Sequence, residues 1–289
     1  MSDRETDYDV IVVGGGPSGA TAAHEIALAG HKVLLLERAF RIKPCGGAIP
    51  PCILGEFDIP RSLLKAEIQS ARMISPKAQK VDMPIEGTFV GMVDRDEFDP
   101  WLRLRAQRAG ADLELAAFKK VEYIDKTTLR VTYVSKDEDT ETRTATARCV
   151  LGADGARSQV ARQGIPKHAD VPWVLAYHEI VEAPEAATED YDPERCEVWY
   201  QGGLSPDFYA WVFPHGKSAS IGVGSAHKDF SAKKSVNELR AISGLDTAET
   251  IRKEGAPIPM KPMKRWDDGK ALLEAHEAMG RRQSVVGFR

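Results

Sequence analysis

The fold of the first part of this chain is indicated by the residues Asp9-Val10-Ile11-Val12-Val13-Gly14-Gly15-Gly16-Pro17-Ser18-Gly19. The opening residues of this stretch form a short, mostly β-branched run, which is typical of a strand buried on both faces. The glycines at 14, 16 and 19 then follow the spacing G-x-G-x-x-G. An alanine-rich segment over residues 18–29 predicts a helix that ends at Gly30, because glycine is favoured just beyond a helix end. The chain therefore begins with a strand, a glycine-rich turn and a helix.

A second apolar run, residues 32–37, ends in Glu37 and completes a strand–helix–strand unit. In such a unit Gly14 permits a tight turn, Gly16 lets the backbone approach a pyrophosphate, and Gly19 allows close helix–strand packing. The N–H groups at the helix start face the phosphates. Glu37 is placed to accept hydrogen bonds from ribose hydroxyls. These residues predict a dinucleotide site, without distinguishing NAD from FAD.

Composition excludes several classes of protein. The 289 residues include 39 Lys plus Arg and 43 Asp plus Glu, a net charge of −4, so no basic surface for nucleic acid is expected. Four scattered cysteines fit neither a zinc site nor a disulfide scaffold, which indicates a reducing compartment and no metal. The start is charged where a signal peptide is apolar, and no apolar run approaches the roughly 20 residues of a membrane span. We expect a soluble, cytoplasmic protein.

The rest of the chain predicts an α/β fold with two domains. Residues 111–150 alternate strand-like runs with polar turns, as in a small antiparallel sheet inserted into the nucleotide domain. Residues 171–225 read as several strands followed by a helix near 235–243. We therefore expect a Rossmann-like FAD-binding domain with a parallel sheet, plus an inserted, mainly antiparallel β-sheet substrate domain. The first would comprise residues 1–75 and 92–168, with 255–289 as an incomplete return segment, and the second 76–91 and 169–254.

Three segments resemble flavoproteins of the aromatic-hydroxylase-like superfamily. The sequence of residues 14–19, together with Glu37-Arg38, is similar to that of the FAD-binding half of flavoprotein oxidoreductases. Residues 92–99 with a helix over 101–109, and residues 149–158, resemble the superfamily's arginine-plus-helix segment and its Asp-Gly motif. The resemblance implies contacts to FAD from Arg38, Arg95, Asp154 and Gly155. An ordinary turn is the alternative for the Asp-Gly pair.

Two further segments resemble the geranylgeranyl reductase family. They are Lys43-Pro44-Cys45-Gly46-Gly47-Ala48-Ile49-Pro50 and the Tyr-x-Trp-x-Phe-Pro pattern within residues 208–214. The sequence of residues 43–50 most resembles the chlorophyll and bacteriochlorophyll branch of the family. The resemblance to the family extends over residues 8–268. It implies an NADPH-dependent reductase that converts geranylgeranyl to phytyl, on the diphosphate or on a (bacterio)chlorophyll ester. Peripheral contact with a photosynthetic membrane is then expected. The alternatives are an aromatic-hydroxylase-like monooxygenase and a truncated, inactive fragment.

The substrate residues have a chemical rationale and open alternatives. Tyr209, Trp211 and Phe213 alternate along a strand and share one face, either as the wall of a prenyl channel or as ordinary core. Gly46 and Gly47 are candidate cofactor-binding residues, because they would let backbone approach a planar ring beside Cys45. Cys45 is a candidate proton donor or positioning group, or else a small buried hydrophobe. We expect structural roles for the remaining cysteines, and structural or surface roles for four histidines, namely His24, His168, His178 and His215.

The sequence departs from this family near its end. The resemblance implies a third flavin motif, a short apolar strand followed by Gly-Asp, soon after residues 266–269. Residues 270–273 begin such a strand, but residues 274–282 contain no Gly-Asp. The expectation is a shortened product, with apolar surface exposed on the central sheet and weakened FAD binding.

Overall fold

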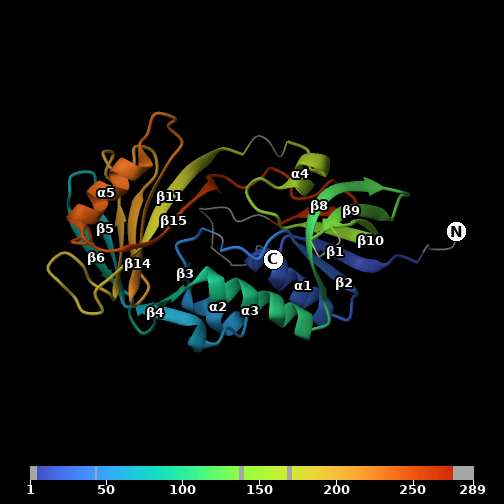
Figure 1. Ribbon diagram of the computed structural model, residues 1–289, viewed down its shortest axis with the longest axis horizontal. Helices are drawn as coiled ribbons and strands as arrows, with labels where there is room; N and C mark the ends of the chain where they lie inside the picture. Colours follow the sequence, from blue (N-terminus) through green and yellow to red (C-terminus); the bar gives the residue numbers. More distant parts are fainter. Residues whose placement is uncertain (1–4, 43, 137–139, 168–170, 276–289) are drawn as a thin grey trace. The chain divides into compact units, whose positions relative to one another are not determined.

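A computed structural model describes residues 5–42, 44–136, 140–167 and 171–275 (Figure 1). The expected tail at 276–289 lies outside these residues, as does His168. The chain forms two compact units. Unit 1 comprises residues 1–42, 98–172 and 259–289, and unit 2 comprises residues 43–97 and 173–258.

Unit 1 is built on a sheet with a parallel centre. Strand β1 (Tyr8–Val13) pairs in parallel with β2 (Val33–Glu37) and β10 (Thr142–Gly152), and β10 pairs in parallel with β16 (Leu272–Glu274). β2 also pairs in parallel with β8 (Asp112–Tyr123). The central strands are apolar on both faces, as the residue pattern requires, and β2 is buried throughout. The predicted parallel sheet is therefore confirmed, including the strand expected after residue 269.

The antiparallel strands of unit 1 extend this same sheet. β9 (Leu129–Ser135) pairs antiparallel with the second half of β8 and with the first half of β10. The antiparallel strands expected over residues 111–150 are therefore present, and they continue the parallel sheet, because β8 and β10 are long enough to belong to the parallel centre at one end and to the antiparallel part at the other.

The helices of unit 1 begin and end where the sequence places their signals. Helix α1 (Pro17–Leu28) has Gly16 at its N-cap and proline at its first position, and Gly30 follows it with φ +87°. α3 (Arg95–Arg108) begins at Arg95, earlier than the expected Trp101. α4 (Gln159–Gly164) starts at an N-cap Ser158, whose Oγ accepts the Ala161 N–H at 2.9 Å.

Unit 2 contains two sheets. The seven-stranded sheet has the order β15-β11-β14-β13-β12-β5-β6, and the three-stranded sheet has the order β3-β7-β4. Their strands are β3 (Ala48–Ile49), β4 (Leu64–Ile68), β5 (Ser70–Ile74), β6 (Lys80–Pro84), β7 (Val90–Val93), β11 (Trp173–Glu182), β12 (Arg195–Trp199), β13 (Ala210–Pro214), β14 (Ser218–Ser225) and β15 (Thr250–Pro259). Two short helices, α2 (Pro51–Glu56) and the 3-10 helix Arg61–Leu63, precede β4.

One face of the large sheet is covered by α5 (Ala232–Ile242), which lies across β11 and β14 in Figure 1. Ala210, Val212 and Ile221 pack on this side with Val236 and Leu239 of the helix. Because side chains alternate along a strand, Trp211 and Phe213 project from the opposite face.

The division between the units differs from the expected boundaries. Residues 43–75 belong to unit 2, and β5 pairs in parallel with β12, more than a hundred residues later. The short strands from β3 to β7 carry no clear apolar period, so the sequence does not indicate their partners. Among the described residues, no helix is long and apolar enough to cross a membrane.

Candidate functional site

The glycine turn of unit 1 is shaped by contacts that exclude any side chain. Gly14 has φ +106°, and a Cβ there would lie 2.3 Å from the Ala153 carbonyl oxygen. A Cβ on Gly19 would lie 1.9 Å from the Gly14 carbonyl oxygen. The turn therefore packs directly on the start of its own helix and on the backbone after β10. Gly14 and Gly19 fill the structural roles that the fingerprint predicts for them.

Glu37 ties the end of β2 to this turn. Its carboxylate accepts the Gly15 N–H at 2.7 Å and the Ala39 N–H at 3.0 Å, and its side chain is buried. The sequence did not identify the residue on the other side of the turn, Arg103 of α3, whose Nη1 donates to the Gly15 carbonyl oxygen at 3.0 Å. Arg103 is buried on the same helix face as Phe98 and Leu102. An arginine within an apolar stripe is the signal that would have indicated a buried partner.

The Asp-Gly motif lies beside the glycine turn, as the resemblance implies. The Ala153 N–H donates to the Val13 carbonyl oxygen at 2.7 Å, and the Asp154 Cα would lie 2.9 Å from a Cβ on Gly14. Asp154 Oδ2 accepts the Gln159 N–H at 2.6 Å at the start of α4. Asp154 Oδ1 is buried and has no hydrogen-bond partner among the described residues. A buried acceptor without a partner indicates a missing donor.

These features fit the ADP half of FAD. They lie at the carboxyl ends of β1, β2 and β10, where open α/β sheets bind nucleotides. The turn presents bare backbone, and Asp154 Oδ1 offers an acceptor that lacks a donor. Gly155 takes φ +83° in the turn that leads to α4. Arg38 is exposed, and Arg95 is half-buried at the start of α3 in unit 2; for both, a contact with FAD stays a prediction.

At the same edge, β16 ends in a buried carboxyl group where the resemblance implies Gly-Asp. Glu274 is 4% exposed, and its Oε2 would lie 2.1 Å from a Cβ on Gly152. Burial, reinforced by the nearby Asp154 and only partly offset by Ser158, raises the pKa of Glu274 to about 9. Glu274 therefore holds a proton at neutral pH.

In unit 2 the aromatic residues form a continuous row. The ring centroids of Tyr209 and Trp211 lie 6.0 Å apart, and those of Trp211 and Phe213 lie 6.2 Å apart. Phe208 stacks on Tyr209 at 4.1 Å. This row faces away from the α5 core. Trp211 is nevertheless buried, and Phe213 packs against a second apolar cluster that contains Ile68 and Met92. A channel wall and ordinary core therefore both stay predictions for these residues.

The loop that carries Cys45 lies against this row. A Cβ on Gly46 would lie 3.0 Å from Phe213 Cδ2. Cys45 acts electrostatically on the Tyr209 hydroxyl and helps to raise its pKa. Cys45 is exposed, so its reading as a small buried hydrophobe is wrong. The predicted substrate residues Cys45, Tyr209 and Trp211 therefore come together within one unit with Gly46 and Gly47, which were predicted to bind the cofactor. Of the other cysteines, Cys196 is buried, Cys149 half-buried and Cys52 exposed.

Trp211 is held from behind by a polar network. Its Nε1–H donates to Ser220 Oγ at 3.1 Å, and that hydroxyl lies 2.9 Å from Nδ1 of the buried His178. His178 Nε2 lies 3.0 Å from Glu254 Oε2, an acceptor. Because Nε2 must donate to the carboxylate, Nδ1 of a neutral ring accepts the serine proton, and every bond in the chain is satisfied. The indole is thus fixed in one orientation.

Gly222 on β14 gives the indole its space, which yields a prediction. A Cβ there would lie 2.2 Å from Trp211 Cζ2 and 2.6 Å from His178 Cβ. Gly222→Ala is expected to displace the ring, to lower the free energy of unfolding by about 1–3 kcal/mol and to change the tryptophan near-UV circular dichroism. Gly202→Ala, where a Cβ meets nothing within 4 Å, is the control. Equal spectra and equal stability for the two variants would contradict this packing.

Tyr209 keeps its proton over the physiological range. Burial, with the neighbouring Tyr200 and Cys45, raises the pKa of its phenol to about 12. Its hydroxyl is thus a permanent hydrogen-bond donor beside the Cys45 loop.

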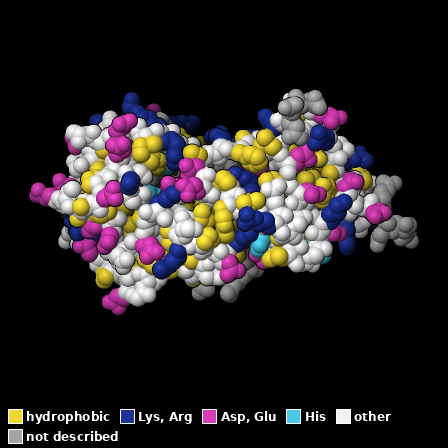
Figure 2. Space-filling view, turned by 60° about the horizontal axis from the view of Figure 1, so that its bottom comes forward, with side chains coloured by type: hydrophobic (Ala, Val, Ile, Leu, Met, Phe, Trp, Pro, Cys, Tyr) yellow, Lys and Arg dark blue, Asp and Glu magenta, His cyan; other side chains and the backbone are white. Residues whose placement is uncertain are grey.

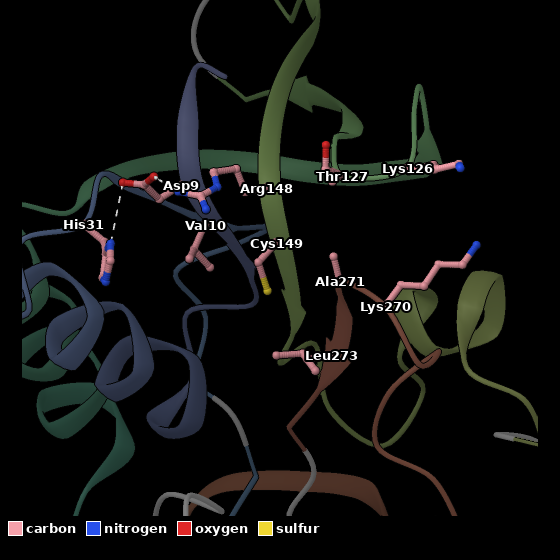
Figure 3. Close-up of a pocket in the computed structure, with 10 residues that line it drawn as sticks. All are labelled: Asp9, Val10, His31, Lys126, Thr127, Arg148, Cys149, Lys270, Ala271 and Leu273. Atoms are coloured by element: carbon pink, nitrogen blue, oxygen red, sulfur yellow. Dashed lines mark ion pairs between the residues drawn. The ribbon is translucent and has the colours of Figure 1, made fainter. Parts of the chain in front are cut away.

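A pocket of about 630 Å³ lies elsewhere in unit 1 (Figure 3). Its apolar floor is formed by strand residues such as Val10, Cys149 and Leu273, and its rim carries Lys126, Arg148 and Lys270 among others. Asp9 at this rim pairs with His31 at 3.8 Å. The pocket is at the amino ends of the parallel strands, opposite the end that binds nucleotides, so it is not the predicted site.

Figure 2 shows acidic, basic and apolar side chains interspersed on the face in view.

Known proteins resemble this chain over most of its length. Residues 8–190 match the family described as pyridine nucleotide-disulphide oxidoreductase. A geranylgeranyl diphosphate reductase from Rhodobacter capsulatus is 54% identical over 274 residues, covering 94% of this chain and 68% of that protein. A chloroplastic geranylgeranyl diphosphate reductase from Oryza sativa is 36% identical and covers 91% and 59%, respectively. This chain thus spans about three fifths of the plant relative.

A solved structure from Thermoplasma acidophilum, described as geranylgeranyl bacteriochlorophyll reductase-like, superposes with a TM-score of 0.81 at 26% identity. It covers 92% of this chain, which covers 70% of it. The fold and the glycine–aspartate site define an FAD-dependent oxidoreductase. Within that class, the chain belongs to the geranylgeranyl reductase family. The predicted family, fold class and FAD cofactor are confirmed.

Proposed function

We propose that this chain carries the cofactor-binding and prenyl-binding parts of an NADPH-dependent geranylgeranyl reductase. It would reduce geranylgeranyl double bonds to phytyl, on the diphosphate or on a (bacterio)chlorophyll ester. The observation that carries the proposal is the packing of the Cys45–Gly47 loop against the aromatic row of β13. The geranylgeranyl diphosphate reductase names of the relatives from Rhodobacter capsulatus and Oryza sativa support the substrate class.

The residues of unit 1 would bind FAD, which supplies hydride-transfer chemistry when bound. Gly14, Gly16 and Gly19 would admit the pyrophosphate, Glu37 would accept from the ribose, and Asp154 would accept a hydrogen bond through Oδ1. Arg38, Arg95 and Gly155 would complete these contacts. Electrons would come from NADPH, a donor typical of this reductase family.

The residues of unit 2 would bind and orient the prenyl chain. Tyr209, Trp211 and Phe213 offer apolar surface to an isoprenoid and exclude water from it. Saturating one isolated double bond takes a hydride at one carbon and a proton at the other. The Cys45 thiol, exposed beside Tyr209, is placed to supply that proton or to orient the alkene. A pigment-linked substrate would bring the protein to a membrane surface as a peripheral partner.

The test is product analysis after incubation with FAD, NADPH and geranylgeranyl diphosphate. Mass spectrometry is expected to find prenyl products that have gained hydrogen in proportion to the NADPH consumed. Trp211→Ala is expected to raise KM more than it lowers kcat, because the indole contributes binding surface. Oxygen uptake with NADPH loss and no reduced prenyl product would contradict the proposal and favour a monooxygenase. A folded chain that binds no FAD would instead indicate an inactive fragment.

A further inference from the structure

His215 follows the aromatic row directly and is buried beneath the Cys45 loop. It begins the turn between β13 and β14, where its N–H donates to the Ser218 carbonyl oxygen at 2.7 Å. The His215 side chain is 6% exposed. Nδ1 lies 3.0 Å from Asp94 Oδ1, and Nε2 lies 3.0 Å from the Gly46 carbonyl oxygen. The ring thus bridges a carboxyl group and the loop backbone.

Both partners of this ring are acceptors. A backbone carbonyl only accepts, and an ionised carboxylate only accepts. Burial alone would raise the pKa of Asp94, but its hydrogen bond to His215, with the charges of His215, Lys65 and Arg252, lowers it. Asp94 is therefore ionised at neutral pH. Two acceptors require a hydrogen on each ring nitrogen, so this geometry holds His215 as an imidazolium cation.

The ring also sets the shape of the loop by direct packing. Gly47 has φ +76°, and a Cβ there would lie 2.5 Å from His215 Cε1 and 2.4 Å from the Val93 carbonyl oxygen. A Cβ on Gly46 would lie 3.0 Å from Phe213 Cδ2, so the next residue of the loop is packed closely as well. The Gly47 N–H donates to Cys45 Sγ at 3.4 Å. A shift of the imidazole would therefore reach the thiol through two glycines.

We propose that His215, paired with Asp94, is a positioning residue that clamps the Gly46–Gly47 backbone in its charged form and so places Cys45 on the aromatic row. The clamp opens when the imidazole loses a proton, because one of its two hydrogen bonds then has no hydrogen. The consequence for prenyl reduction rests on the proposed reductase function. The clamp itself is a property of unit 2.

Other charged groups around the clamp set the conditions of the test. Lys65 and Arg252 act on Asp94, and Lys65 is itself paired with Glu97 at 2.5 Å. Asp96 also acts on Lys65, whose backbone oxygen lies close to Gly216. A pH-dependent change in the loop is therefore assigned to His215 only if it disappears when His215 is replaced.

The experiment is hydrogen–deuterium exchange of the peptide covering residues 44–49, in protein without FAD, NADPH or substrate. Exchange is corrected for the intrinsic effect of pH. His215→Phe keeps a planar ring and removes both donors, and we expect about tenfold faster exchange in this loop at pH 6. Because a ring with one hydrogen can donate to only one of the two acceptors, the wild-type loop is expected to lose protection as the pH is raised. His215→Lys, which keeps a cationic donor, should restore protection and remove that pH dependence.

Thiol alkylation gives a second readout, with an internal reference. Cys45 and Cys52 are both exposed in unit 2, so their alkylation rates are compared by mass spectrometry in the same sample. The rate ratio of Cys45 to Cys52 should change in His215→Phe and change in the same direction in Asp94→Asn. If His215→Phe fails to fold, Asp94→Asn and the wild-type pH profile still decide the question.

Unchanged exchange and an unchanged alkylation ratio in folded His215→Phe, with a flat wild-type pH profile, would overturn the proposal. Because no cofactor or substrate is present, this result is independent of reductase activity. A chain that reduces no prenyl bond can still show the clamp, and an active chain can still lack it.

Discussion

Replacing Gly19 by alanine is expected to abolish FAD binding and to destabilise unit 1. In an ordinary helix this substitution stabilises by about 1 kcal/mol. Here the new Cβ would lie 1.9 Å from the Gly14 carbonyl oxygen, a backbone atom that cannot move aside alone. Relieving the overlap would push α1 away from the turn that is to receive the pyrophosphate. We expect at least a hundredfold loss of FAD affinity and a loss of about 3 kcal/mol or more in stability.

Gly55→Ala is the matched control for this variant. Gly55 also lies within a helix, α2, and a Cβ there meets nothing within 4 Å. It is expected to leave FAD affinity unchanged and to keep or slightly raise stability. FAD titration followed by fluorescence, together with urea unfolding, measures both quantities. Wild-type FAD affinity in Gly19→Ala would show that the turn does not bind the cofactor as described.

The second large effect is expected at Glu274. The pKa of Glu274 in the folded chain, about 9, lies above the ordinary carboxyl value of 4.5. Below about pH 4.5 the carboxyl group is protonated in both the folded and the unfolded chain, so the stability is highest there. As the pH rises toward 9, the free energy of unfolding falls. At pH 7 ionisation of Glu274 lowers the free energy of the unfolded chain, whereas in the folded chain the buried carboxyl group stays protonated. The cost to folding is about 3 kcal/mol at this pH. Glu274→Gln removes that cost and should raise the free energy of unfolding by about 2–3 kcal/mol.

The pH dependence separates this cause from a general packing effect. The two proteins should be equally stable near pH 4, and the advantage of Glu274→Gln should grow steadily up to pH 8.5. Urea unfolding at several pH values measures it. Glu189→Gln, at an exposed carboxylate, should show no such trend. A constant difference at all pH values would mean that Glu274 is not held neutral in the folded chain.

The local parts of the cofactor site were predictable from the sequence. The strand, the glycine spacing and Glu37 lie within thirty residues, and each has a residue pattern with a known conformational cause. The row of Tyr209, Trp211 and Phe213 was predictable for the same reason, since alternation along a strand fixes the shared face. The fold class followed from these local units.

The long-range parts were not predictable. Arg103 reaches the Gly15 carbonyl across 88 residues, and His215 reaches the Gly46 carbonyl across 169. A single side chain that meets a backbone carbonyl leaves no period or spacing in the sequence. The same holds for β5, whose partner β12 lies far along the chain and moves residues 43–75 into unit 2. His178 and His215, which have no ligand spacing in the sequence, each bridge two polar groups within unit 2.

In the proposed reaction, this chain passes electrons from FAD to a prenyl double bond. The most direct measurement mixes the FAD-loaded chain, reduced with NADPH in the absence of oxygen, with geranylgeranyl diphosphate. The absorbance of oxidised flavin should return in proportion to the double bonds reduced, with hydrogenated prenyl product in the same sample. Absorbance that returns only when oxygen is admitted, with no reduced prenyl product, would contradict the proposed reductase function.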